Sequence, residues 1–137
     1  IWTSRAEAQV YGIDSHGAYP SVSIISGDLS GNLAENAANS LLMIFGHVNI
    51  DSNLHIGDKF SEGTIIGTIA DLDDNSHLHL EVRKRQGTHC FINPVYLFPP
   101  EIQTTLFNAF DEDYVTEDGN TDYNRLHQQW YGTGCSW

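Results

Sequence analysis

Apolar and polar side chains alternate in several short runs along the chain, as is typical of half-buried β-strands. The alternation is weak in residues 8–13 (AQVYGI) and clearer in residues 21–26 (SVSIIS), and residues 14–17 between them have turn chemistry. We predict that these two strands form a hairpin. Residues 40–48 (SLLMIFGHV) are the most apolar stretch, so we expect them to form a central strand.

Two polar, glycine-containing segments separate these strands from the next ones. Residues 27–39 are small and polar, which indicates an exposed, mobile connection with a helical turn at residues 33–38. Gly57 and Gly63 stand six apart in turn positions between short β-rich pieces. Glycine supplies a positive φ or a close backbone approach at such positions, so we predict a sharply folded small sheet.

The stretch from 76 to 82 (SHLHLEV) carries the most chemistry. Successive side chains of a strand point to opposite faces, so we expect His77 and His79 on a polar face and Leu78 and Leu80 on a core face. Two imidazoles about 7 Å apart along a strand can reach one point above the sheet, as a metal or proton-transfer centre requires. A surface strand that merely contains two histidines is the alternative, and the tripeptide alone leaves both open.

Other histidines divide into one further candidate and several surface residues. His47 closes the apolar central strand, so it is either a site residue or a hydrogen-bonded core histidine. His16, His55 and His89 stand in turns or beside them, and we expect them to be solvated. His127 falls in a candidate helix.

Beyond a short strand at residues 90–92 and a turn at Asn93-Pro94, the pattern becomes helical. Residues 101–110 have apolar side chains at helical spacing, which predicts a helix docked on the body, and residues 123–131 can form a second short helix. The acidic residues 111–122 indicate a solvated turn and not a strong calcium site. Residues 130–137 are aromatic enough to pack or to support homo-assembly.

Length and charge limit what the chain can be. The 137 residues, 40% of them hydrophobic, suffice for one domain with a core, and no apolar run is long enough to span a bilayer. The net charge of −12 opposes binding to nucleic acid or to anionic membranes. The chain starts at Ile1 without a basic-then-apolar leader, so we expect a processed or trimmed start with further residues upstream.

Cys90 and Cys135 are the two cysteines. Buried free thiols and a single disulfide are both compatible with the sequence. We predict the disulfide, because it would anchor the aromatic tail to the body. By the loop-entropy model this closure would contribute about 4 kcal/mol, and a mass spectrum of the non-reduced protein tests it.

Several of these pieces occur together in a recognisable order, which is His47, Gly57-Asp58, Gly63 to Gly67, His77-Leu78-His79-Leu80-Glu81 and Ile92-Asn93-Pro94-Val95-Tyr96-Leu97. Over about residues 6–98 the chain resembles the lysostaphin-type (LytM-like) zinc metallopeptidases, which cut peptide cross-links of bacterial cell walls. The resemblance implies a mostly β fold of small antiparallel sheets, the duplicated hybrid motif. We expect this domain to occupy residues 1–100, with residues 101–137 as a helical C-terminal extension packed on it.

Carried over to this chain, the resemblance makes His79 a zinc ligand and gives His47 and His77 the catalytic handling of the attacking water and the oxyanion. The chemistry agrees, because a neutral imidazole binds zinc well and histidine in general exchanges protons near neutral pH. Bound zinc lowers the pKa of water to about 7 and polarises the scissile carbonyl.

One part of the family pattern is missing. The family's other two zinc ligands lie in a His-x-x-x-Asp motif, which does not occur in this chain. If Asp14 were the aspartate, Val10 would stand in the histidine position, and the 33 residues from Asp14 to His47 are too few. The Gly-Pro that usually precedes the histidine pair is also absent. Either the ligand pair lies upstream of residue 1, or the domain is a zinc-free relative.

Two functions therefore follow as expectations. The first is a zinc-dependent endopeptidase acting on cell-wall or similar Gly-rich peptides, incomplete in this chain. The second is a non-catalytic binding or structural assembly module that keeps the fold. Both place the chain outside the cell or in the cell envelope, with a peptide or cell-wall polymer as partner.

Overall fold

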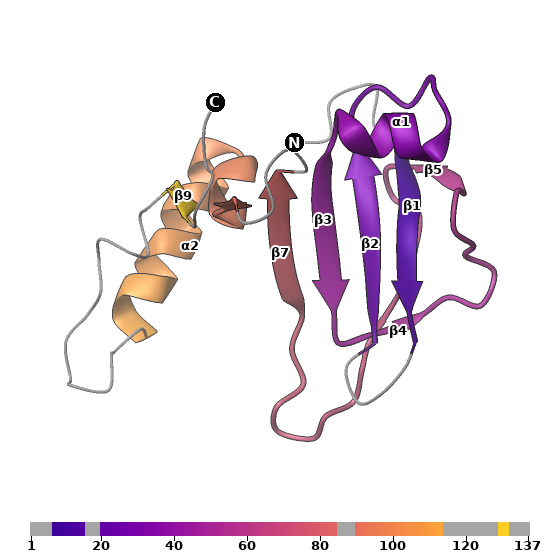
Figure 1. Ribbon diagram of the computed structural model, residues 1–137. Helices are drawn as coiled ribbons and strands as arrows, with labels where there is room; N and C mark the ends of the chain where they lie inside the picture. Colours follow the sequence, from indigo (N-terminus) through magenta and orange to yellow (C-terminus); the bar gives the residue numbers. More distant parts are fainter. Residues whose placement is uncertain (1–6, 16–19, 85–89, 114–128, 132–137) are drawn as a thin grey trace.

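A large antiparallel sheet forms the body of the protein, which is mostly β (Figure 1). The computed structural model describes residues 7–15, 20–84, 90–113 and 129–131. Within these ranges the large sheet has seven strands in the order β5-β1-β2-β3-β7-β8-β9, and β4 pairs with β6 in a small second sheet. The elements are β1 (Glu7–Asp14), β2 (Ser21–Ser26), α1 (Leu33–Ala38), β3 (Leu41–Gly46), β4 (Val48–Ile50), β5 (Lys59–Ser61), β6 (Gly67–Ile69), β7 (His79–Lys84), β8 (Phe91–Ile92), η1 (Pro94–Leu97), α2 (Pro100–Asp113) and β9 (Trp130–Tyr131).

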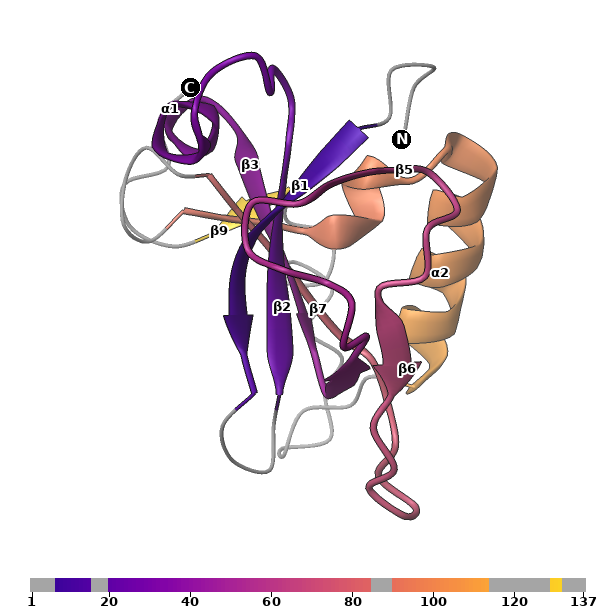
Figure 2. The same ribbon diagram turned by 90° about the vertical axis from the view of Figure 1, so that its right-hand side faces the viewer.

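The two faces of the large sheet are covered differently. Figure 2 shows the sheet nearly edge-on, with α1 on one side and β6 and α2 on the other. The main core lies on the β6 side and contains Ala8, Val10, Val22, Ile24, Met43, Val82 and Ile92. A smaller cluster lies under α1 and contains Ile25, Leu29, Ala37 and Leu42. Among the described elements, α1 lies over this face and covers one end of it (Figure 1).

Most of the predicted elements are confirmed. β1 and β2 pair as an antiparallel hairpin, β3 is central, and α1 spans the predicted helical turn. Asn32 caps α1 by accepting a hydrogen bond from the backbone N–H of Glu35, whose side chain in turn accepts one from Asn32. The helix predicted for residues 101–110 is α2, which starts at Pro100.

The glycine turns also match their prediction. Gly57 and Gly63 have φ values of 91° and 84°, in the region that favours glycine. Gly67 allows a close approach, because a Cβ atom there would collide with the backbone oxygen of Asn49. These glycines shape the turns on either side of β5 and the pairing of β6 with β4.

The connection between β2 and β3 is more structured than predicted. Leu29, Asn36 and Ala37 are 7%, 2% and 1% exposed, so this part of the segment is buried and not an exposed linker. The polar residue Asn36 can be buried here because its side-chain atoms are hydrogen-bonded to Gln9 of β1 and to the backbone of Gly31, just before α1.

The prediction of a second C-terminal helix at residues 123–131 is wrong at the end of that range. Trp130 and Tyr131 form strand β9, which pairs with Ile92 and Phe91 of β8, and the N–H of Asn93 donates to the backbone oxygen of Gln129. An edge strand offers unpaired backbone groups, and aromatic residues suit a strand, so pairing outweighs the local helical pattern. The rest of the predicted helix, the acidic turn and His127 lie outside the described residues.

No helix among the described residues is long and apolar enough to cross a membrane.

Candidate functional site

The three candidate histidines lie at the end of the large sheet away from α1. β3 runs from the α1 end and finishes at Gly46, which pairs with His79, the first residue of β7. His47 follows at once with a φ of 60°, in the left-handed region that non-glycine residues seldom adopt. This backbone turn ends β3 and starts β4, and the backbone oxygen of His47 accepts a hydrogen bond from the N–H of Ala70.

The prediction that His77 and His79 lie on one strand is wrong in its geometry. β7 starts at His79, so His77 precedes the strand, and Leu78 is 45% exposed instead of facing the core. The physical reason is the turn at His47. Because β3 leaves the sheet after Gly46, no strand within the described ranges remains on that side to pair with residues before His79.

Even so, the structure brings the three imidazole rings together. The ring centroids of His47 and His77 are 4.5 Å apart, and those of His47 and His79 are 6.1 Å apart. His47 is half-buried, whereas the side chains of His77 and His79 are exposed. The left-handed backbone at His47 and the residues that lead into β7 at His79 thus bring the rings together. The sequence predicts the same cluster, but from two histidines on one strand.

Hydrogen bonding fixes the protonated nitrogen of His77. Its Nδ1 lies 2.5 Å from the backbone oxygen of Asn75. A carbonyl oxygen can only accept, so Nδ1 carries the hydrogen. In the neutral ring Nε2 then has the lone pair, which is available to take a proton or a ligand.

Glu81 stands beside His79 on the same face of β7. Its Oε2 lies 3.8 Å from Nε2 of His79, and its Oε1 contacts Nε of Arg83. The Arg83 guanidinium in turn lies over the Phe91 ring of β8, 5.2 Å from the centroid. A row of side chains therefore runs from β8 to the histidine cluster.

The cluster also changes the electrostatics of His47. Partial burial lowers the pKa of His47 below its ordinary value of 6.5, and the neighbouring His77 and His79 lower it further. The charged form of one imidazole is unfavourable beside two others. At neutral pH the His47 ring is therefore neutral.

We tested whether these residues fit the zinc ion that the resemblance implies. Imidazole nitrogen is a good zinc ligand, and the exposed His79 ring is accessible. Among the described residues, however, no group of three or more His, Cys, Asp or Glu side chains is arranged to hold a metal ion. The donors fit the histidine part of a zinc site, and the remaining ligands would have to come from outside the described residues.

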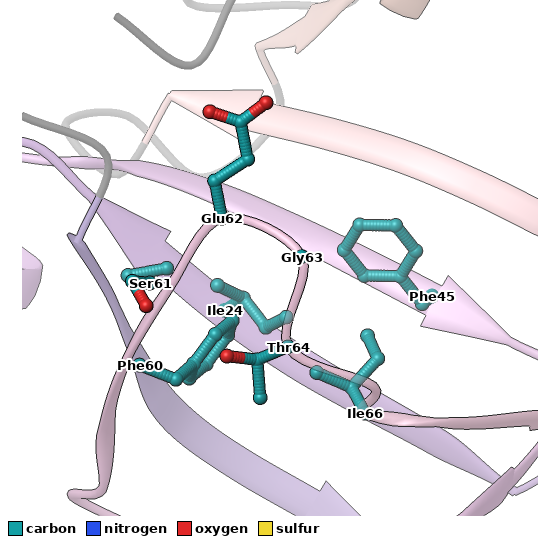
Figure 3. A pocket seen from close by; sticks show the side chains of 9 residues that line it. Ile24, Phe45, Phe60, Ser61, Glu62, Gly63, Thr64 and Ile66 are labelled. Atoms are coloured by element: carbon teal, nitrogen blue, oxygen red, sulfur yellow. The ribbon is translucent and has the colours of Figure 1, made fainter. Parts of the chain in front are cut away.

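A cavity of about 160 Å³ lies on the opposite face of the sheet (Figure 3). Ile24, Phe45, Phe60 and Ile66 line it, and the carboxylate of Glu62 points away from it. Phe45 belongs to the main core, while paired residues Ile44 and Glu81 face the α1 side. The cavity is therefore separate from the histidine cluster.

The other predicted residues stand apart from the cluster or cannot be placed. His55 is exposed and pairs with Asp58, with Nδ1 and Oδ2 3.5 Å apart. Cys90 is 1% exposed, but Cys135, His16 and His89 lie outside the described residues, so the disulfide stays a prediction. Sequence reasoning had named Glu81 only as part of a motif and had missed Asn75. The sequence places both residues close to the two histidines, but it gives no indication of what either residue does.

Comparison with profiles of protein families, with curated proteins and with solved structures finds no match to the chain.

Proposed function

We propose that this chain carries the histidine part of a zinc-dependent endopeptidase site on a fold of the lysostaphin type. The observation that supports it is the convergence of His47, His77 and His79 at one end of the sheet, with ring centroids 4.5 and 6.1 Å apart for the two pairs that include His47. A non-glycine residue in the left-handed region costs about 1–3 kcal/mol and is frequent at functional sites. Two described non-glycine residues have a left-handed backbone, His47 and Asp73, and the first of them is one of these three histidines.

Each histidine has a distinct role in the proposal. His79 would hold the zinc, together with ligands from outside the described residues. The zinc would supply a bound water of lowered pKa and polarise the scissile carbonyl. His77, with Nδ1–H donated to Asn75, presents the Nε2 lone pair to accept the proton of the attacking water. His47, kept neutral by its neighbours, retains a ring N–H to donate to the developing oxyanion.

The proposed substrate class rests on the order of motifs in this chain, which resembles that of the lysostaphin-type enzymes. We propose a Gly-rich peptide of the cell-wall type as substrate, cleaved outside the cell or in the cell envelope. The exposed side chains of His77 and His79 favour this, because a polymer must reach the reacting groups from solvent. The family's duplicated hybrid motif is proposed for the two antiparallel sheets, with residues 101–137 as the extension.

The test uses the protein with its native upstream segment, produced with zinc. We expect stoichiometric zinc and chelator-sensitive cleavage of pentaglycine or peptidoglycan. His77→Ala should abolish cleavage and leave most of the zinc bound, whereas His79→Ala should lose the zinc. His55→Ala is the matched control, because His55 is an exposed histidine away from the cluster, and it should leave both quantities unchanged.

The same experiment can also contradict the peptidase proposal. If the zinc-supplemented protein with its upstream segment binds no metal and leaves both substrates intact, the peptidase proposal fails. The chain would then be a non-catalytic binding or assembly module, with a peptide or polymer partner or a second copy held through the aromatic C-terminal segment.

A further inference from the structure

The main core is not fully closed by the described residues at one place. On the central strands its side chains are buried, and Val10 and Val82 are 0% and 1% exposed. Phe45, Phe60 and Ile66 pack against the same cluster but are only half-buried. All three line the cavity of about 160 Å³ shown in Figure 3. Within the described ranges, this cavity is therefore an opening in the apolar core and not a hollow in a polar surface.

A tight turn borders the cavity on its solvent side. The turn consists of residues 61–64, all exposed, and the N–H of Thr64 donates a hydrogen bond to the backbone oxygen of Ser61. Gly63 is third in the turn with a φ of 84°, the positive value that a type II turn requires at that position. A Cβ atom at Gly63 would meet nothing within 4 Å, so the space beside this part of the turn is open.

The lining behind this turn is apolar. Ala8 of β1 and Ile24 of β2 are buried and form the inner side of the cavity. Phe45, Phe60 and Ile66 form its walls. Two of the three walls are phenyl rings, against which another aromatic ring packs well edge-to-face or offset.

Charge and hydrogen-bonding capacity lie at the rim. Glu62 is the charged residue among the described lining residues, and its carboxylate points away from the cavity (Figure 3). Ser61 and Thr64 contribute hydroxyl groups, and both residues are exposed. A charged group inside the cavity would lose water without gaining a partner of opposite charge, which is costly. The lining therefore selects an uncharged ligand, and it accepts a polar substituent only at the rim.

The volume sets the size of that ligand. An apolar cavity of about 150 Å³ lined by leucine, isoleucine and phenylalanine side chains takes up one benzene molecule. The cavity here has nearly the same volume and a similar lining. One six-membered ring is thus the unit that fits.

We propose that this cavity binds a small uncharged molecule that contains one aromatic ring. The ring lies against Phe45 and Phe60, and a hydroxyl substituent lies at the rim beside Ser61 and Thr64. The site is on the opposite face of the sheet from the histidine cluster, so the proposal is independent of the proposed function.

The first experiment titrates the isoleucine-labelled chain with benzene and records methyl ¹H–¹³C spectra. The methyl groups of Ile24 and Ile66 should shift saturably, because the ring current of the bound ring acts at short range. Ile25 packs in the smaller cluster on the other face and should not shift. Phenol should bind as benzene does, and benzoate should bind at least about 10-fold more weakly. The absence of saturable shifts, or equal affinities for benzoate and benzene, overturns the proposal.

The second experiment changes the size of the cavity. Ile66→Phe should fill it and abolish benzene binding, whereas Ile69→Phe, at a 54% exposed isoleucine outside the lining, should leave binding unchanged. Ile24→Val makes room for one more methyl group, so it should raise the affinity for toluene relative to benzene by about 4-fold. Ile25→Val is the matched control on the other face of β2 and should leave that ratio unchanged.

Backbone amide spectra confirm that these variants fold, and the mild Ile24→Val change keeps the test decisive if Ile66→Phe does not. Benzene binding that survives in a folded Ile66→Phe variant lies elsewhere and overturns the proposal. An unchanged ratio of toluene to benzene affinity in Ile24→Val overturns it as well.

A third variant tests an occupant from the chain itself. Residues 1–6 contain Trp2 and directly precede Glu7, which pairs with Ser61 at the rim. Equal benzene affinities of the wild type and Trp2→Ala support a site for an external ligand. Benzene binding that appears only in Trp2→Ala shows that the chain's own segment occupies the cavity, and it overturns the proposal.

Discussion

The two ends of the large sheet use polar side chains in opposite ways. At the α1 end, the buried Asn36 side chain donates to Gln9 Oε1 and to the backbone oxygen of Gly31, and accepts from the N–H of Gly31. Gln9 in turn donates to the backbone oxygen of Gly57. The network joins β1, α1 and the turn before β5, so it holds three segments distant in sequence together.

At the histidine end, polar groups are gathered at a cost in stability. Three imidazoles approach one another, the backbone of His47 is left-handed, and the pKa of His47 is lowered by partial burial and by its neighbours. The left-handed backbone joins β3 to β4, but the crowding of the three imidazoles is not needed for that connection. Satisfied buried polar groups thus mark the structural end of the sheet, while strain and crowded titratable groups mark the end proposed to be functional.

The largest expected effect is the loss of Asn36. Asn36→Ala should lower the free energy of unfolding by about 3 kcal/mol, since Gln9 and both backbone groups of Gly31 lose a buried partner. Urea unfolding measures it. Asn39→Ala is the control, because Asn39 is exposed, and it should cost far less. Equal costs for the two variants would show that the Asn36 network is not structural.

A smaller effect is expected at Gly46, which faces the histidine end. A Cβ there would lie 3.2 Å from Cβ of His79, so Gly46→Ala should displace His79 and cost about 1–2 kcal/mol. In Gly12→Ala, the new Cβ would meet Ser23 at 3.9 Å, an ordinary contact, so this variant serves as the control. Imidazole chemical shifts should change for His79 in the first variant only. An unperturbed His79 in Gly46→Ala would contradict the close fit.

Backbone strain at His47 can be isolated by comparing two truncations. Both His47→Ala and His47→Gly remove the ring, but only glycine adopts a positive φ without penalty. The glycine variant should therefore melt about 3 °C above the alanine variant. Calorimetry under identical conditions measures the difference. If the alanine variant melts at the same temperature or higher, the left-handed residue stores no strain.

The pH dependence should be the smallest effect. Because the pKa of His47 is lowered in the folded protein, the unfolded chain takes up a proton first as the pH falls. The contribution of His47 is therefore fully present above about pH 6.5 and is lost as the pH falls through the folded-state pKa. NMR titration should give His47 a midpoint below that ordinary value. A midpoint at or above it would contradict the crowding, and His47→Asn should reduce the slope of stability with pH.

Local patterns were sufficient for much of the fold but for less of the site. The alternation of residues 21–26 and the glycines at 57 and 63 report local preferences, and the structure confirms them. The start of β7 and the strand β9 depend on which distant segment supplies a hydrogen-bonding partner, so local pattern misplaced both. Asn36 looked like part of an exposed linker for the same reason, because its partner Gln9 is remote in sequence.

The histidines show a related limit. Their residue types and order suggested one cluster, and the structure places the rings together. Their arrangement comes from the left-handed turn at His47. Histidine is enriched in the left-handed region, as are asparagine and aspartate, but a positive φ is uncommon for any non-glycine residue, so the sequence alone does not locate the turn.

Strand β9 has a consequence for the time course of biosynthesis. On one side, β8 pairs with β7, which is close in sequence. On the other side it pairs with β9, whose residues are synthesised roughly forty positions later. At about 5–20 residues per second, the ribosome takes about 2–8 s to deliver them. During that interval the backbone groups on one edge of β8 are open to strands of neighbouring nascent chains. Ribosome-associated chaperones would therefore be most needed during those seconds, and slower translation after Ile92 would lengthen them.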